Sequence, residues 1–382
     1  MTRGGSAGGV VLETGVFAAA MAELAAIVES KSSIPILQNV LIQSDGAGQL
    51  HLTATNLDMQ YSMHLPVASG EAMAVTVQAK RLATALATFA KGSQCGFEVA
   101  DGWMRLRSGR AVMRLPVLAP DDFPLMPDKD EMAIRWMMPG AVLRDALDGV
   151  AFAMSVEDTR HFLLGVNLSL YEGRLCFAAT DGLRLAVRSL AVPEGADALE
   201  RAADVILPRK LVLLLRGINE AGDVEVKVVR RRRIVIRFPS GRCIASKLID
   251  ADYVDFRRII PKSMPHQLSL PRDELGEALA RVQLMADDKD RTICLTLDAE
   301  QARIEARAQD GADVVEELPC TWSGEPGTRI GFNAKQLREQ VDKMSGDAIV
   351  LHRDGADDAK GKFNMIDGAD EGDLYLLSGV RV

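Results

Sequence analysis

Basic residues recur at three places in this chain, separated by nearly equal steps. The segments Val77-Gln78-Ala79-Lys80, Leu207-Pro208-Arg209-Lys210 and Phe332-Asn333-Ala334-Lys335 end in lysines that lie 130 and 125 residues apart. Ammonium and guanidinium groups attract phosphate oxygens without reading base sequence. The spacing therefore predicts sequence-independent contact with a nucleic-acid backbone, and an ordinary solvated helix face is the alternative. The basic residues concerned are Lys80, Arg81, Arg209, Lys210, Lys335 and Arg338.

Residues that could carry out catalysis show no comparable order. The five histidines are scattered, and the sequence has no H-E-x-x-H, no G-x-S-x-G and no phosphate-cradling glycine loop. Asp250, Asp252 and Asp255 could suggest a metal site, but aspartates that flank a turn more often cap it or face solvent. We therefore predict a protein that is not an enzyme and that needs no cofactor and no metal.

The bulk composition limits the function classes. The chain has 382 residues and a net charge of -8, from 45 basic and 53 acidic residues, which argues against a general nucleic-acid binder. Net charge does not exclude a local basic patch, because exposed charges are screened over about 8–10 Å at physiological salt. Aromatic residues make up only 5%, so there are few platforms on which single-stranded bases could stack.

Cysteine usage and hydropathy indicate the cellular compartment. The five cysteines show neither metal-ligand nor redox spacing, so we expect reduced core thiols in a cytoplasmic protein. The apolar stretch 16–28 is interrupted by Glu23 and is too short to cross a bilayer. We therefore predict no membrane partner.

A second, unrelated marker repeats with the same period. Ala54-Thr55-Asn56-Leu57, Ala179-Thr180-Asp181-Gly182-Leu183 and Ala308-Gln309-Asp310-Gly311 each follow a strand-like run, at steps of 125 and 129 residues. Two markers with one period predict a triplicated domain of about 125 residues. The domain boundaries that we expect are 10–130, 134–262 and 266–382.

Each third of the chain combines two helical patterns with several alternating strands. Apolar residues at helical spacing predict helices around Phe17–Ile27, Leu82–Phe89, Val142–Val150, Leu211–Leu215, Leu275–Val282 and Leu337–Met344. Period-two runs such as 224–228, bounded by Gly and Asp turns, predict antiparallel strands. The predicted fold class is α+β, with two helices packed on antiparallel sheets in each repeat.

Beyond these patterns, the chain resembles the bacterial sliding clamp, the beta subunit of DNA polymerase III, from about Leu12 to Val382. The segments that carry the resemblance are Ile34–Asn39, Asp122–Pro124, Thr159–Gly165, Ala179–Ala186, Ser246–Asp250, Asp255–Pro261, Ile330–Asn333 and Arg381-Val382. The resemblance implies a head-to-tail homodimer whose six domains form a ring around duplex DNA. It also implies a non-catalytic protein that confers processivity by tethering the polymerase, and that binds a clamp loader and repair proteins through short peptides.

The resemblance assigns residues to DNA. The helices that begin near Lys80, Lys210 and Lys335 would line the hole. Lys31 and the loop with Arg160, His161 and Phe162 would approach DNA at the face of the ring. For that loop, a turn with one buried aromatic side chain is the alternative.

The resemblance also places a pocket for client peptides on the second domain, beside the C-terminus. Aliphatic walls with a polar rim suit this kind of recognition, although the leucines could equally be core residues. The matching positions are Leu163, Thr180, Gly182, Leu183, Arg184, Leu185, Val254, Arg258, Ile259, Leu376, Leu377, Ser378, Gly379, Val380, Arg381 and Val382.

The chain departs from the family pattern in the pocket. The tail Ser378–Val382 replaces the usual Met-Pro-Met-Arg ending, Leu183 stands where histidine is common, and Val254 where proline is common. These changes remove soft apolar surface and stiffness. A specialised paralogue, either a decoy or an inhibitor-resistant duplicate with altered client binding, is therefore the alternative function.

Three further expectations concern the remaining surface. By resemblance, Met113 and Leu115 of one protomer would meet Leu284 and Met285 of the other, with Asp290 weakening this contact. Each of these residues could instead be ordinary strand or helix core. The run Arg230–Arg233 is either a nucleic-acid contact or an exposed hairpin tip, and we favour the tip. The acidic stretch Asp354–Asp373 is expected to be a solvated loop before the final strand.

Overall fold

The computed structural model describes residues 9–29, 31–127, 133–199, 204–261, 263–286, 291–353, 362–367 and 372–382. Asp290 and residues 354–361 and 368–371 therefore lie outside the described residues. The chain divides into two compact units, Met1–Gly140 with Glu220–Leu248, and Ala141–Asn219 with Ile249–Val382. The middle third of the chain is thus shared between the units.

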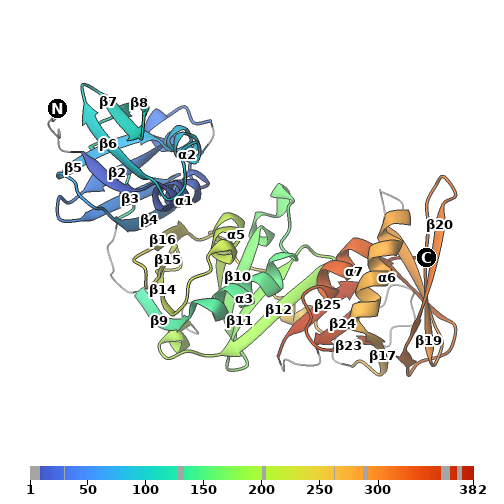
Figure 1. The fold of residues 1–382 in the computed structure, drawn as a ribbon. Coiled ribbons are helices and arrows are strands. Elements are labelled where there is room, and N and C mark those ends of the chain that lie inside the picture. Colours follow the sequence, from blue (N-terminus) through green and yellow to red (C-terminus); the bar gives the residue numbers. More distant parts are fainter. Residues whose placement is uncertain are drawn as a thin grey trace. The chain divides into compact units, whose positions relative to one another are not determined.

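The first third sets a pattern of strand, helix, three-strand meander, strand, helix and a second three-strand meander (Figure 1). Its elements are β1 (Val10–Glu13), α1 (Thr14–Ala25), η1 (Pro35–Gln38), β2 (Asn39–Ser44), β3 (Gln49–Thr55), β4 (Met59–Pro66), β5 (Met73–Gln78), α2 (Ala79–Ala87), β6 (Gln94–Ala100), β7 (Trp103–Ser108) and β8 (Ala111–Leu118).

The second third repeats the pattern. Its elements are β9 (Ala133–Pro139), α3 (Gly140–Ala151), η2 (Asp158–Leu163), β10 (Gly165–Tyr171), β11 (Arg174–Thr180), β12 (Arg184–Ala191), η3 (Ala196–Ala198), β13 (Val205–Pro208), α5 (Arg209–Gly217), β14 (Asp223–Val229), β15 (Arg233–Arg237) and β16 (Cys243–Lys247).

The last third repeats it again, with one short extra strand, β21. Its elements are η4 (Phe256–Ile259), β17 (His266–Pro271), α6 (Arg272–Met285), β18 (Thr292–Leu297), β19 (Gln301–Arg307), β20 (Asp313–Pro319), β21 (Thr321–Trp322), β22 (Thr328–Asn333), α7 (Ala334–Val341), β23 (Ala348–Arg353), β24 (Lys362–Asp367) and β25 (Leu374–Ser378). The six predicted helices are confirmed. The prediction of a single loop over Asp354–Asp373 is wrong, because β24 pairs with β23 and β25 there.

The repeats share sheets across their boundaries. A twelve-stranded sheet has the order β1-β6-β7-β8-β5-β2-β3-β4-β16-β15-β14-β9, and a nine-stranded sheet has the order β13-β10-β11-β12-β25-β24-β23-β17-β21. A four-stranded sheet has the order β20-β19-β18-β22. At each shared boundary the last strand of one repeat pairs with the third meander strand of the preceding repeat: β16 with β4, and β25 with β12.

The period-125 marker forms the same turn in every repeat. Asn56 accepts the backbone N–H of Met59 at 2.7 Å, Asp181 accepts that of Leu183 at 2.9 Å, and Asp310 accepts that of Ala312 at 3.0 Å. A short Asn or Asp side chain that binds the backbone two or three residues ahead stabilises a tight turn. The repeated marker is therefore explained by turn chemistry.

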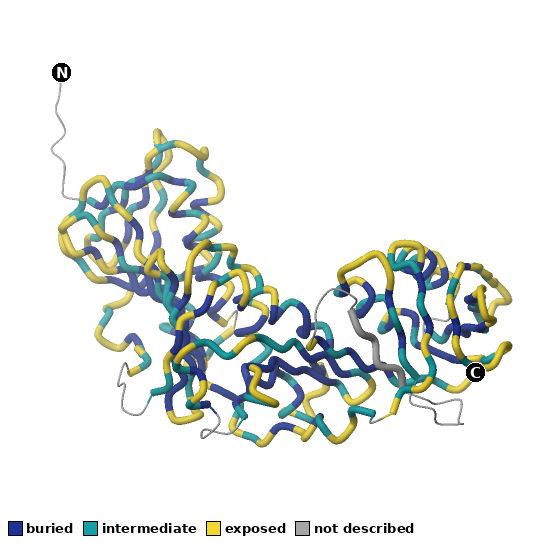
Figure 2. The backbone as a smooth tube through the Cα atoms, turned by 90° about the horizontal axis from the view of Figure 1, so that it is seen from below, coloured by how far each residue is buried: buried dark blue, intermediate teal, exposed yellow. Residues whose placement is uncertain are grey.

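Helices are fixed by capping and by one buried face. The carboxylate of Glu13 accepts the N–H groups of Gly15 and Val16 at the start of α1, and the buried Phe17 of that helix stacks on Phe97 at 5.9 Å between ring centres. In the last third, α6 and α7 lie side by side (Figure 1). The backbone coloured as buried in Figure 2 follows the strands, whereas exposed residues concentrate in the turns.

The cysteines and the helices bear on the expected compartment. Cys95, Cys176 and Cys294 are buried free thiols, as expected, whereas Cys243 and Cys320 are free but only half-buried. In the part of the chain that the structure describes, no helix is both long enough and apolar enough to span a bilayer.

Candidate functional site

A cavity of about 290 Å³ opens in the second compact unit, where four segments of the chain meet. The segments are η2, the turn between β11 and β12, the stretch around η4, and strand β25. The residues that line the cavity are Arg160, Phe162, Leu163, Thr180, Gly182, Leu183, Arg184, Leu185, Val254, Asp255, Phe256, Ile259, Leu376 and Ser378.

The cavity has an apolar floor and a partly apolar rim. Leu163, Leu185 and Leu376 are buried and belong to one core cluster beneath it. Leu183, in contrast, exposes 58% of its surface at the rim, and Ile259 is exposed as well. Such a floor favours apolar side chains of a ligand, because each buried methylene contributes about 0.8 kcal/mol.

Turn chemistry holds the rim in place. The hydroxyl of Thr180 donates to the carbonyl of Arg184 at 2.6 Å and accepts the N–H of Gly182 at 3.0 Å. Gly182 has a φ of 93°, which a residue with a side chain rarely adopts. The N–H of Ser378 donates to the carbonyl of Leu183 at 2.8 Å, so that β25 fixes the far side of this turn.

A buried tyrosine supports the turn from below. The hydroxyl oxygen of Tyr253 accepts the N–H of Thr180 at 3.1 Å, and burial raises the pKa of this phenol far above its ordinary value. Tyr253 therefore stays neutral. It belongs to the same core cluster as Phe256.

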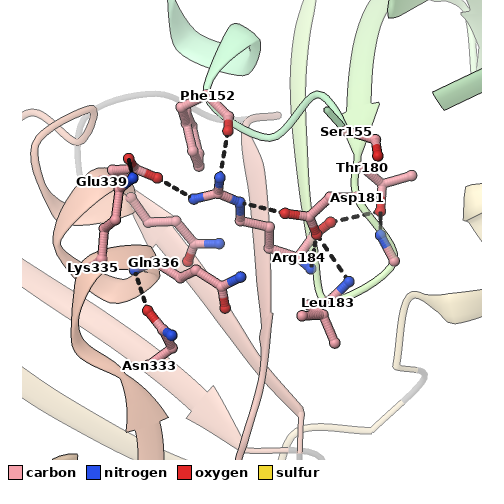
Figure 3. Close-up of polar contacts among 12 residues, drawn as sticks. Phe152, Ser155, Thr180, Asp181, Leu183, Arg184, Asn333, Lys335, Gln336 and Glu339 are labelled. Carbon is pink, nitrogen blue, oxygen red and sulfur yellow. Dashed lines mark hydrogen bonds and ion pairs between the residues drawn. The ribbon is translucent and has the colours of Figure 1, made fainter. Parts of the chain in front are cut away.

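The positive charge of Arg184 is neutralised inside the protein (Figure 3). Its guanidinium donates to Asp181 at 3.0 Å, to Glu339 of α7, and to the carbonyl of Phe152 at 2.6 Å. Only 10% of the side chain is exposed. Arg184 therefore acts mainly as a structural cross-link of the cavity wall.

Most of the predicted pocket residues meet at this cavity. The ten that line it are Leu163, Thr180, Gly182, Leu183, Arg184, Leu185, Val254, Ile259, Leu376 and Ser378. Sequence reasoning missed Asp255 and Phe256, although both begin a segment that carried the family resemblance. It also assigned Arg160 and Phe162 to DNA, whereas both line this cavity.

Six predicted pocket residues are not in the lining. They are Arg258, Leu377, Gly379, Val380, Arg381 and Val382. Arg258 is 83% exposed and pairs with Asp255, while Leu377 is fully buried in the alternation of β25. The N–H of Val380 donates to the carbonyl of Gly331 at 2.8 Å, which directs the tail across β22. A Cβ at Gly331 would lie 2.4 Å from the carbonyl oxygen of Val380, so only glycine permits this approach.

The lysines that recur in the sequence occupy equivalent positions in the three repeats. Lys80, Lys210 and Lys335 are each the second residue of a helix, α2, α5 and α7 respectively, and each is exposed. Arg81 is exposed next to Lys80, and Arg209 is half-buried next to Lys210. The prediction that the three lysines start equivalent helices is confirmed.

These positions work against helix stability. The N-terminus of a helix carries a partial positive charge, and a basic side chain there costs about 0.3–1 kcal/mol. A partial compensation exists in α7, where Lys335 lies 3.8 Å from Glu339. Helix stability alone therefore does not explain a lysine at the same place in three helices, whereas an anionic ligand would.

The loop residues assigned to DNA divide into two groups. Lys31 and His161 are exposed, and the ring of His161 meets that of Phe162 edge-on at 5.8 Å. Arg160 forms an ion pair with Glu157 at 2.7 Å. Phe162 is half-buried against the core cluster, which agrees with the alternative of a turn with one packed aromatic side chain.

The residues predicted to form the dimer contact differ in exposure. Leu284 is 79% exposed and Met285 is also exposed, at the end of α6. On β8, Met113 is half-buried and Leu115 is buried.

Two remaining sequence features have plain structural roles. Arg230 and Arg231 form the tip between β14 and β15 with positive φ, so the prediction of a hairpin tip is confirmed. No cluster of three or more metal-ligating side chains occurs in the described residues, and Asp255 pairs with arginines instead.

Three family models match the chain in succession. They describe the N-terminal, central and C-terminal domains of the DNA polymerase III beta subunit, and they match residues 10–127, 137–255 and 257–356. The beta sliding clamp of Caulobacter vibrioides is 30% identical over 98% of this chain and 100% of the relative. That of Escherichia coli K12 is 27% identical over 92% of this chain and 94% of the relative.

Solved structures agree with these relatives. The sliding clamp of Bartonella birtlesii, in a crystal structure with griselimycin bound, is 28% identical and superposes with a TM-score of 0.91, covering 98% of this chain and 100% of that chain. A Caulobacter crescentus beta sliding clamp gives 28% identity and a TM-score of 0.90, covering 98% and 99%. The triplicated fold and these matches agree over nearly the whole length, and the chain therefore belongs to the beta sliding clamp family, the beta subunits of DNA polymerase III.

Proposed function

We propose that two copies of this clamp subunit close head to tail around duplex DNA and hold client proteins through the cavity of about 290 Å³. The chain is a non-catalytic processivity factor of DNA replication by its family membership. The ring, the DNA-facing lysines and the client site are the parts proposed here. The observation that carries the proposal is the threefold placement of lysine at the second residue of α2, α5 and α7.

Strand pairing supports closure into a ring. β4 is completed by β16 and β12 by β25, but β20 ends its sheet with no further strand among the described residues. In the first repeat, β8 pairs with β5 only through its last two residues, Val117 and Leu118, which leaves the earlier part of that edge without a partner from β5. If the first repeat follows the same rule, β8 takes β20 of a second copy as its neighbour. Such a head-to-tail contact uses two different surfaces and forms a ring when the rotation closes.

Analytical ultracentrifugation tests this contact. Replacing Leu284 and Met285 by Glu places charges on the proposed contact, so we expect the dimer to dissociate. Val156→Glu is the control, because Val156 is also an exposed aliphatic residue but belongs to the segment between α3 and η2 and not to β8, β20 or α6. A double variant that sediments as the wild type does would refute the proposed contact.

The proposed DNA contact is tested by charge reversal. Lys80→Glu, Lys210→Glu and Lys335→Glu together should lower the length of DNA synthesised per binding event, because phosphate attraction along the lining is lost. The control is charge reversal at three basic residues on strands, which changes the net charge equally. These are Arg105, which is half-buried, and the exposed Lys247 and Arg303. If both triple variants shorten synthesis equally, the effect comes from net charge alone, and the proposal that these three lysines line the hole is excluded.

The client site is tested with a fluorescent clamp-binding peptide derived from a polymerase. Leu183→Asp puts a charge on the apolar rim, so we expect at least about tenfold weaker binding, whereas Arg258→Ala should bind as the wild type does. Deleting Tyr375–Val382 is not a suitable test, because β25 is a buried strand between β12 and β24. Absence of peptide binding to the intact protein would contradict the client site and leave the family membership standing.

A further inference from the structure

Two histidines that the clamp function does not use face each other on the large sheet of the first unit. His51 of β3 and His64 of β4 are direct partners in the antiparallel register. Their ring centres lie 4.1 Å apart, and the ring planes are inclined by 58°. His64 is exposed and His51 half-buried, so the pair is accessible from solvent.

The separation of the rings suits a shared metal ion. A zinc–imidazole bond is about 2.0–2.1 Å long, so a bound ion lies about 3.2 Å from the centre of each ring. If one nitrogen of each ring points at a shared ion, ring centres 4.1 Å apart correspond to an angle of about 80° at that ion, which is near the angle between neighbouring ligands in square or octahedral coordination. The spacing of the two rings therefore fits a shared ion of this geometry.

The surroundings keep this face of the hairpin open to a cation. Gly241 lies next to His64 and has no side chain to cover the ring, although a Cβ there would make an ordinary contact at 3.8 Å from the imidazole. The carboxylate of Asp45 lies within electrostatic reach of His51 and contributes a negative charge.

We propose that His51 and His64 form a binding site for a divalent transition-metal cation that accepts imidazole in square or octahedral geometry, namely Ni²⁺ or Cu²⁺. In the part of the chain that the structure describes, no third His, Cys, Asp or Glu completes the site. Water therefore fills the remaining coordination positions. Mg²⁺ and Ca²⁺ do not fit, because they select oxygen ligands.

Calorimetric titration of the full-length protein with Ni²⁺ at pH 7.5 tests the proposal. We expect one saturable site per chain, which excess Mg²⁺ does not displace. Because two linked ligands bind far more tightly than one, His51→Gln and His64→Gln should each weaken binding by at least about tenfold. His161→Gln removes an exposed histidine that has no histidine partner, so it should leave the affinity unchanged.

A second control separates imidazole from thiol binding. Cys243 and Cys320 are half-buried free thiols that could also take up nickel, so the titration is repeated with both replaced by Ser. Unchanged binding in this double variant supports the histidine site. The proposal fails if no saturable binding occurs, if the two histidine variants bind as the wild type does, or if only the thiol variant loses the metal. Circular dichroism of each variant verifies that the fold persists.

Discussion

Arg184 of β12 and Glu339 of α7 form an ion pair that joins the wall of the cavity of about 290 Å³ to the helix that carries Lys335 (Figure 3). The two residues are 155 positions apart in the chain. Asp181 shares the same guanidinium, so two carboxylates offset one buried positive charge. The cavity and helix α7 are therefore held together by the same side chain.

Arg184→Met should destabilise the protein. The substitution keeps much of the aliphatic volume but leaves Asp181 and Glu339 without the cation between them. Removing one partner of a buried pair costs about 3–5 kcal/mol, and the partial exposure of Glu339 reduces this to about 2–4 kcal/mol. Calorimetry should therefore show a lower unfolding temperature. Arg258→Met is the control, since an exposed ion pair contributes at most about 1 kcal/mol. Equal melting of both variants would show that the Arg184 network is not stabilising.

Alanine substitutions at two separate glycines test the close approach of β10 and β13. A Cβ at Gly165 would lie 2.2 Å from the carbonyl oxygen of Leu207, so Gly165→Ala should force the strands apart and cost about 2 kcal/mol or more. Gly217→Ala, at the end of α5, meets nothing within 4 Å and should be neutral or stabilise by up to about 1 kcal/mol. Urea unfolding distinguishes the two, and a neutral Gly165→Ala would contradict the packing described here.

Asp148 of α3 predicts a pH dependence of stability. Burial raises the pKa of this carboxyl, but hydrogen bonds from Lys343 and Arg216 outweigh burial, and its pKa lies below the ordinary value. A carboxyl with a depressed pKa in the folded state stabilises the fold above its unfolded pKa of about 3.9, and this stabilisation is lost as the pH falls through the folded pKa.

Asp148→Asn should therefore melt at a lower temperature than the wild type at pH 7, and the difference should shrink below about pH 4. The matched control is Asp145→Asn in the same helix, where the exposed carboxylate pairs with the neighbouring Arg144. A difference for Asp148→Asn that stays constant from pH 7 to pH 3 would mean that packing, and not the charge, is lost.

How far the sequence predicts this molecule depends on the range of the interaction. Helix positions follow from the local spacing of apolar residues, and the structure confirms them. The repeat of the segments around Asn56, Asp181 and Asp310 is also visible in the sequence, and the structure shows that each forms a turn. β24 was missed because the acidic segment around it has the composition of a loop, whereas its pairing with β23 and β25 is non-local.

The cavity shows the same limit. The resemblance assigns the whole tail from Leu376 to Val382 to the pocket. Because side chains alternate along a strand, Leu376 lines the cavity whereas Leu377 faces the core. Likewise, Glu339 is recognisable as the partner of Arg184 only once α7 is placed beside β12. A contact over this sequence distance has no local signal.

Charge reversal of the lysines at the helix starts should affect stability and DNA retention in different directions. A basic residue in the first turn opposes the helix dipole, so Lys80→Glu and Lys210→Glu should leave the unfolding free energy unchanged or raise it by up to about 1 kcal/mol each. The same variants should weaken retention on DNA, most strongly at low salt, because each reversal removes phosphate attraction. Lys335→Glu also breaks the pairing of Lys335 with Glu339, and its net gain in stability should again be at most about 1 kcal/mol. Thermal unfolding and a DNA-retention assay on the same preparations check both parts. Variants that lose DNA retention only because they unfold would contradict the proposal that these lysines are placed for DNA.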